Sequence, residues 1–288
     1  MTEERVVVDE AIDVLLEAYD PTAIGDVEFR GHQFDAGLAM VQAPVGFGGL
    51  GMAPTLQRHI ERRLLDAGRS PEDPTGFFRH LAAPTILTHG SDEVKKRFLR
   101  PMFTGEERWC QLFSEPGAGS DFAGLGARGV RDGDEWIVSG QKVWNTLAHV
   151  ADWGMLVVRT DPNLPKHRGL TYFAVDMRAP GVEVRPLRQI TGEAEFNEVY
   201  LTDVRIPDTN RIGDVGEGWR AALTTLMNER TAIGGGTPRQ GGGAIGELLS
   251  VWHKLSAAER TPSRRERVMQ LWTKAEALRL TNVRGSQN

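Results

Sequence analysis

The stretch WCQLFSEPGAGSDFAG, residues 109–124, marks the point at which the chain changes from a helical to a strand-like pattern. Its first half, Trp109 to Phe113, is apolar enough for a buried strand. Its second half is rich in glycine, proline, serine and acidic residues, which favours a loop. Backbone N–H groups in such a loop are barely obstructed by side chains and can approach an anionic ligand. A plain tight turn is the alternative interpretation.

The residues before this stretch predict helices separated by loops. Apolar residues recur at helical spacing in 8–16 and in 56–65. Between them, residues 44–54 (PVGFGGLGMAP) contain too much glycine and proline for a regular element. In the next helical segment Ser91 is a candidate N-cap, and Pro101 predicts the end of the helix.

The residues after this stretch predict strands. The segment ARGVRDGDEWIVSG has two alternating runs around Asp132-Gly133-Asp134, which is a hairpin signal. Four further strand-like runs follow, separated by glycine and proline: WGMLVVRT, LTYFAVDM, VEVRPL and FNEVYLTDVRI. Because no helix-length periodic segment interrupts them, we expect an antiparallel, β-barrel-like domain and not an alternation of strands and helices.

Helical periodicity returns after Gly216, for example in WRAALTTLMNERTAIG, and the chain then ends within about two further helices. The predicted fold class is therefore α+β. We expect an N-terminal helical domain over 1–108, a middle β domain over 109–215, and a partial C-terminal helical bundle over 216–288.

The composition excludes several classes of function. The formal net charge is −5, whereas binding to nucleic acid or to an anionic membrane favours a basic excess. The single cysteine, Cys110, excludes a disulfide within the chain, and the seven histidines lack the spacing of a metal site. The N-terminus does not resemble a signal peptide, and no apolar run approaches the roughly 18 residues of a membrane span. We expect a soluble, cytoplasmic protein.

Several segments, in their order along the chain, resemble the acyl-CoA dehydrogenase family, and most closely its bacterial FadE-like branch. The resemblance is strongest between residues 83 and 235. The matching segments include APTILTHGSDEVKKRFL, LFSEPGAGSD, GQKVWNT, KHRGLTYFAVDM, FNEVYLTDVRIP and LMNERTAIGGG.

The resemblance implies FAD bound between the middle domain and the C-terminal helices, some of them from a neighbouring subunit. It implies removal of the α-proton of an acyl-CoA thioester and transfer of the β-hydrogen, as hydride, to flavin N5. The product is a trans-2-enoyl-CoA. Electron-transfer flavoprotein is the implied electron acceptor, and a second subunit, identical or different, is an implied partner.

The resemblance also assigns flavin contacts to the opening loop. Ser120, beside Gly119, corresponds to the family's pyrophosphate contact. Ser114 corresponds to the hydroxyl residue that faces the flavin ring, where many relatives carry threonine. Phe113 falls where a backbone N–H reaches the pyrimidine edge of the flavin.

The segment GQKVWNT is the second implied flavin contact. The family places its tryptophan, here Trp144, against the flavin face, and a hydroxyl residue, here Thr146, near N5. A large rigid aromatic side chain suits stacking and the exclusion of water. Asn145 and Leu147 depart from the family pattern and are expected to change the polarity and bulk beside the flavin.

The α-proton of a thioester is too weakly acidic for water to remove at neutral pH, so the reaction needs a carboxylate in a dry pocket. In some family members this carboxylate comes from the first long helix of the C-terminal domain, immediately before an arginine. The matching residue is Glu229, followed by Arg230 as a substrate contact. Leu226, Met227 and the glycines at 234–236 make these surroundings unusually apolar. A solvated Glu–Arg surface pair is the alternative.

The helices remaining after residue 218 are too few for the complete bundle of this family. We therefore expect either a truncated chain or a fold completed by another polypeptide. Two other functions stay open: a flavin oxidase or monooxygenase on the same fold, and a non-catalytic or half-site subunit of a heteromeric dehydrogenase. The acyl group, whether fatty, branched or steroid-derived, stays open as well.

Overall fold

The computed structural model of the protein describes residues 2–71, 74–233 and 240–285. The chain divides into two compact units, Met1–Asn228 and Glu229–Asn288, and each is described by itself. This division into two compact units does not test the three domains expected from the sequence, and the boundaries of those domains stay a prediction.

The first unit begins with helices that enclose an apolar core. They are α1 (Glu3–Ala18), α2 (Asp26–Asp35), α3 (Gln57–Asp66), α4 (Arg79–His89) and α5 (Asp92–Thr104). Val8 and Ile12 of α1 meet Ile60 and Leu64 of α3 in this core, and all four side chains are fully buried. The helical spacing of apolar residues in the sequence correctly indicates the buried faces of both helices.

Helix α5 begins where the sequence predicts but continues beyond the predicted stop. The Ser91 hydroxyl accepts a hydrogen bond from the backbone N–H of Val94 at 3.3 Å, so Ser91 is the N-cap. The prediction that Pro101 ends the helix is wrong, since α5 runs to Thr104 and ends before Gly105, which is left-handed (φ 89°). Burial of Met102 together with the two residues after it stabilises this last turn against the missing proline N–H.

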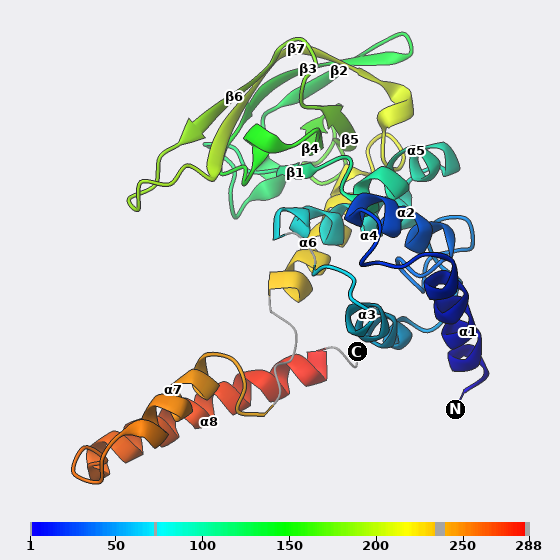
Figure 1. Cartoon of the computed structure of the whole chain (residues 1–288). Coiled ribbons are helices and arrows are strands. Elements are labelled where there is room, and N and C mark those ends of the chain that lie inside the picture. The colour runs from blue at the N-terminus through cyan, green and yellow to red at the C-terminus, as the bar shows by residue number, and fades with distance from the viewer. Residues whose placement is uncertain (1, 72–73, 234–239, 286–288) are drawn as a thin grey trace. The chain divides into compact units, whose positions relative to one another are not determined.

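The middle of the chain forms one curled, seven-stranded sheet (Figure 1). Its strands are β1 (Trp109–Leu112), β2 (Arg128–Asp132), β3 (Glu135–Lys142), β4 (Trp153–Arg159), β5 (Leu170–Asp176), β6 (Val182–Leu187) and β7 (Phe196–Pro207). The order is β1-β4-β2-β3-β7-β6, and β5 pairs with β4. The predicted hairpin is confirmed, because β2 and β3 pair antiparallel around Gly133, whose φ is 65°.

The fold prediction is confirmed, with one difference in strand direction. Most pairs are antiparallel, but β1 and β2 each run parallel to β4, so the sheet is mixed. A short turn forces its two strands to be antiparallel, whereas β1 and β4 are joined by a long connection that imposes no direction. Packing against the rest of the sheet therefore determines this pairing.

The C-terminal helices are α6 (Gly218–Ile233), α7 (Ala244–Lys254) and α8 (Pro262–Gly285). Helix α6 begins in the first unit, where Ala221, Ala222 and Thr225 are buried. In the second unit α7 and α8 pack against each other. Among the described helices, none combines the length and the apolar character that a membrane-spanning segment requires.

Candidate functional site

The glycine-containing loop leaves the sheet where β1 ends. Two backbone hydrogen bonds between Glu115 and Ala118, of 2.9 and 3.0 Å, close a tight turn, so that Gly119 and Ser120 follow it on an exposed surface. At the base of the loop the Phe113 ring is buried against Phe122, with ring centroids 4.8 Å apart. The loop thus has a packed base and an open tip.

The second predicted segment lies directly beside this loop. Strand β3 ends at Lys142, and the backbone N–H of Val143 donates to the carbonyl oxygen of Ser114 at 2.9 Å. This bond places Trp144 and Thr146 next to the loop that carries Ser114. Residues that lie about 30 positions apart in the sequence therefore share one surface.

Trp144 has an unusual backbone conformation. Its φ is 62°, in the left-handed region that bulky residues rarely adopt, and its side chain is 63% exposed. Leu147 is left-handed too, with φ 58°. Backbone strain of this kind persists only where the surroundings impose it, and it concentrates at functional sites. The exposed indole is available to stack on a planar ligand.

Two buried asparagines impose this conformation. The Asn145 side chain, 1% exposed, donates to the carbonyl of Gln111 on β1 at 2.8 Å. The Asn197 side chain donates to the carbonyl of Asn145 at 2.9 Å, and the Asn145 N–H donates to the carbonyl of Asn197 at 3.0 Å. The departure from the family pattern at Asn145 thus fastens the segment to β1 and β7.

A buried ion pair, which no sequence pattern indicates, links both segments to the interior of the sheet. Lys142 is fully buried, and its ammonium group lies 2.8 Å from a carboxylate oxygen of Glu115. Burial lowers the pKa of Lys142, and the Glu115 carboxylate opposes that change. A lysine in a strand with a glutamate in a loop gives no sequence signal of pairing, because the contact depends on how β1 and β3 are brought together.

The loop tip fits a phosphate-bearing cofactor. A Cβ added at Gly117 or Gly119 would meet no heavy atom of the described residues within 4 Å, and neither glycine has a positive φ. The fold of the chain by itself therefore gives no reason for glycine at these positions. Close approach of a ligand to the backbone does give one. The open glycines and the exposed Trp144 leave a stretch of backbone and an aromatic side chain accessible to a ligand that carries phosphate and a planar ring.

Gly119→Ala tests this interpretation. The free energy of unfolding is expected to stay within about 1 kcal/mol of the unmodified value or to rise, because alanine fits here and restricts the unfolded chain. FAD affinity is expected to fall about tenfold. Chemical denaturation and titration with FAD measure the two effects separately. Equal FAD affinity in both proteins would show that the methyl group meets no ligand.

Glu229 and Arg230 belong to the second unit, so their predicted roles at this site stay predictions. In helix α6 Glu229 is half-buried and Arg230 is exposed. Met227, one of the apolar neighbours, is 59% exposed. The glycines at 234–236, also part of the prediction, lie outside the described residues.

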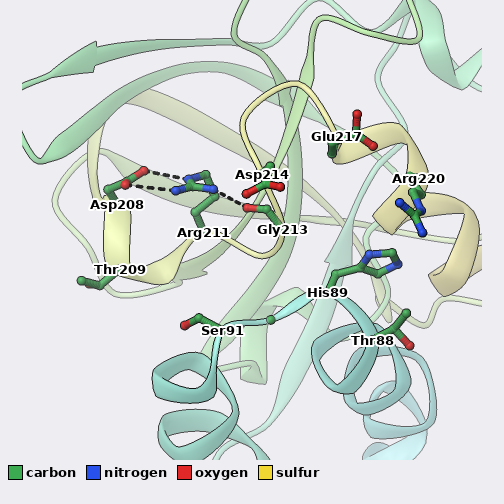
Figure 2. A pocket seen from close by; sticks show the side chains of 11 residues that line it. Thr88, His89, Ser91, Asp208, Thr209, Arg211, Gly213, Asp214, Glu217 and Arg220 are labelled. Atoms are coloured by element: carbon green, nitrogen blue, oxygen red, sulfur yellow. Dashed lines mark hydrogen bonds and ion pairs between the residues drawn. The ribbon is translucent and has the colours of Figure 1, made fainter.

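A separate polar cavity of about 430 Å³ lies between the end of α4, the start of α5, the short 3-10 helix η5 (Asp208–Asn210) and the start of α6 (Figure 2). The predicted site residues are not among those that line it. Asp208 lines this cavity, and its carboxylate accepts hydrogen bonds from Arg211 at 2.8 Å and from the Trp136 indole at 2.7 Å. These contacts, led by Arg211, lower the pKa of Asp208 to about 2.

Asp208→Asn is expected to lower the free energy of unfolding at pH 7 by about 2 kcal/mol, the value of a carboxylate whose pKa is lowered from 3.8 to about 2. Because the folded-state pKa is the lower one, this contribution is complete above pH 5 and declines as the pH falls toward 2. Urea denaturation at pH 7, 5 and 3 should show the difference shrinking by about half at pH 3. A difference that does not change with pH would contradict the ion-pair explanation.

Two family models match the chain. The acyl-CoA dehydrogenase N-terminal domain matches residues 4–106, and the acyl-CoA dehydrogenase middle domain matches residues 110–204. The chain belongs to the acyl-CoA dehydrogenase family. The loop with Ser114 and the segment with Trp144 both lie inside the middle-domain match.

Curated relatives agree with this assignment. Acyl-CoA dehydrogenase FadE34 of Mycobacterium tuberculosis is 49% identical over 217 residues, which are 75% of this chain and 30% of that protein. Acyl-CoA dehydrogenase IpdE1 of the same organism is 37% identical over 244 residues, 85% of this chain and 63% of that protein. The chain thus spans less than two thirds of the length of either acyl-CoA dehydrogenase.

Solved structures share the fold. The Tcur3481-Tcur3483 steroid acyl-CoA dehydrogenase has a TM-score of 0.71 at 28% identity, over 96% of this chain and 73% of that chain. The ChsE4-ChsE5 complex of Mycobacterium tuberculosis has a TM-score of 0.68 at 28% identity, over 100% of this chain and 77% of that chain. Both are named as assemblies of two components.

Proposed function

We propose that this chain acts in an FAD-dependent acyl-CoA dehydrogenase that converts an acyl-CoA thioester to a trans-2-enoyl-CoA. The observation that carries the proposal is the bond between Val143 and Ser114, which joins the open glycine loop to the segment that presents Trp144. The two segments together offer a phosphate-accessible backbone beside an exposed indole. Membership of the family supports the choice of FAD as the ligand.

Each predicted residue has a defined role in holding FAD. Gly119 and Ser120 would receive the pyrophosphate, since both residues are exposed and Gly119 is unobstructed. Trp144 would stack on the flavin ring and shield it from water. Ser114 and Thr146 would offer hydroxyl groups to the flavin, and the Phe113 backbone N–H would bind the pyrimidine edge of its ring. When bound, FAD supplies the hydride acceptor for the β-hydrogen.

Glu229 is the proposed base that removes the α-proton, and Arg230 is the proposed contact for the acyl-CoA. A carboxylate is most effective in this role in a water-poor pocket, where its basicity is raised. Glu229 is half-buried within α6, and this is compatible with such a role. Electron-transfer flavoprotein is the proposed acceptor for the electrons of the reduced flavin.

A second candidate function is that of one subunit in a heteromeric dehydrogenase with a shared FAD site. Two solved structures similar to this chain are named as assemblies of two components. The steroid dehydrogenase among them also supports the inclusion of a steroid-derived acyl group among the candidate substrates. In this case the chain contributes the loop and Trp144, while a partner completes the site.

The visible absorption spectrum of the purified chain tests the proposed function. Flavin absorbance that bleaches on anaerobic addition of one thioester, from a panel of fatty, branched and steroid-derived acyl-CoAs, would support the dehydrogenase. A colourless chain that acquires flavin absorbance only with a second polypeptide would support the subunit role. Reduction without added thioester, or no flavin under either condition, would contradict both.

A further inference from the structure

We propose that Lys142 and Glu115 form a positioning pair that holds the glycine loop in the conformation that receives FAD. The proposal deepens the function proposed above and rests on FAD being the ligand of this loop. Neither residue needs to touch FAD for this role, because both act through the backbone of the loop.

Lys142 reaches three parts of the site from within the sheet. Its ammonium group donates to the carbonyl of Phe113 at 3.1 Å and to the carbonyl of Val157 at 2.8 Å, besides its contact with Glu115. Val157 lies on β4 and Phe113 follows β1, so one side chain links β3 to two segments with which β3 forms no strand pairing. The lysine fixes the carbonyl that precedes Ser114.

Glu115 extends this link to the far side of the loop. Its two carboxylate oxygens accept hydrogen bonds from the backbone N–H groups of Gly126 and Ala127, the latter at 3.0 Å. Its own backbone closes the turn with Ala118. The carboxylate and its buried lysine thus connect the entry and the exit of the loop, and the backbone of the same glutamate closes the turn between them.

The burial of this pair favours a positioning role over a purely stabilising one. Taking two charges out of water costs about as much as their attraction returns, so apolar residues of similar volume often stabilise a protein equally well. Replacing the pair by apolar residues would, however, remove the hydrogen-bond donors and acceptors that define the path of the loop. An exposed pair, Lys166 with Asp121, lies beside the same loop and provides a natural contrast, with side chains 50% and 65% exposed.

The experiment compares four single variants by FAD titration of the FAD-free chain at a temperature where circular dichroism shows each to be folded. Lys142→Met and Glu115→Gln each remove one side of the pair. Lys166→Met is the matched exposed control. Val204→Ala, in the fully buried core of β7, is the control for lost stability without a loop contact.

Lys142→Met and Glu115→Gln are expected to weaken FAD binding at least about tenfold, and both controls less than about threefold. Wild-type affinity in either pair variant would overturn the proposal, as would an equal loss in Val204→Ala. If Lys142→Met does not fold, the FAD affinity of Glu115→Gln alone tests the proposal.

Amide hydrogen exchange of the FAD-free chains separates this proposal from the proposed function. Exchange at Ala118, Gly126 and Ala127 is expected to be at least about tenfold faster in Glu115→Gln, with β7 unchanged. This result in a chain that binds no FAD would refute the cofactor assignment while the loop-holding role stands. Unchanged exchange would refute that role whether or not FAD binds.

Discussion

Glu229→Gln is expected to slow the reduction of bound flavin by an acyl-CoA thioester by about 10²–10⁴-fold, the usual contribution of a general base. Glutamine keeps the size of the side chain but cannot accept the α-proton. FAD binding is expected to be unchanged, because the proposed flavin contacts all lie in the first unit, between residues 113 and 146. Anaerobic stopped-flow absorbance measures the rate of flavin reduction.

Glu247→Gln is the matched control, because Glu247 is an exposed glutamate of α7 in the same structural unit. Its rate should equal that of the unmodified chain. Rapid flavin bleaching in Glu229→Gln would agree with the proposed dehydrogenase but would show that Glu229 is not its base. A loss of flavin from this variant would instead place Glu229 in the binding of FAD.

Lys142→Met is expected to lower the free energy of unfolding by about 3–5 kcal/mol, because it leaves the Glu115 carboxylate without its buried partner. This is the second large effect, and urea denaturation followed by circular dichroism measures it. The exposed Lys166→Met should change the free energy of unfolding by less than about 1 kcal/mol.

The double variant Lys142→Met/Glu115→Gln provides an internal check. Removing both charges should recover part of the stability lost in Lys142→Met, because the unpaired carboxylate is then gone. Additive losses would mean that the two side chains contribute independently and that the short contact between them carries little energy. The loop conformation, followed by hydrogen exchange, should remain disturbed in the double variant.

Local patterns indicate most of the elements correctly. The spacing of apolar residues in α1 and α3 reports which face is buried, since helical neighbours recur every three or four residues. The alternating runs around Gly133 indicate a hairpin because a short turn fixes both register and direction. Pro101 misleads because its local effect is outweighed by the packing of the residues after it.

The candidate site, too, can be predicted from the sequence only in part. Gly119, Ser120 and Trp144 can be proposed from short motifs, because glycine and tryptophan have chemical properties that suit phosphate and flavin wherever they lie. That these motifs share one surface depends on the bond from Val143 to Ser114, which links positions far apart in the chain. No local pattern specifies such a bond.

Residue types and spacings are thus sufficient for the helices, the strands, the hairpin and the motifs that suggest a flavin site. The parallel pairing of β4, the left-handed Trp144, the hydrogen bonds of Asn145 and Asn197, and the Lys142–Glu115 pair arise only when β1, β3, β4 and β7 come together. The physical reason is that periodicity and turn chemistry act over a few residues. Buried charges and strained dihedrals, in contrast, are held by partners about 15 to 50 positions away.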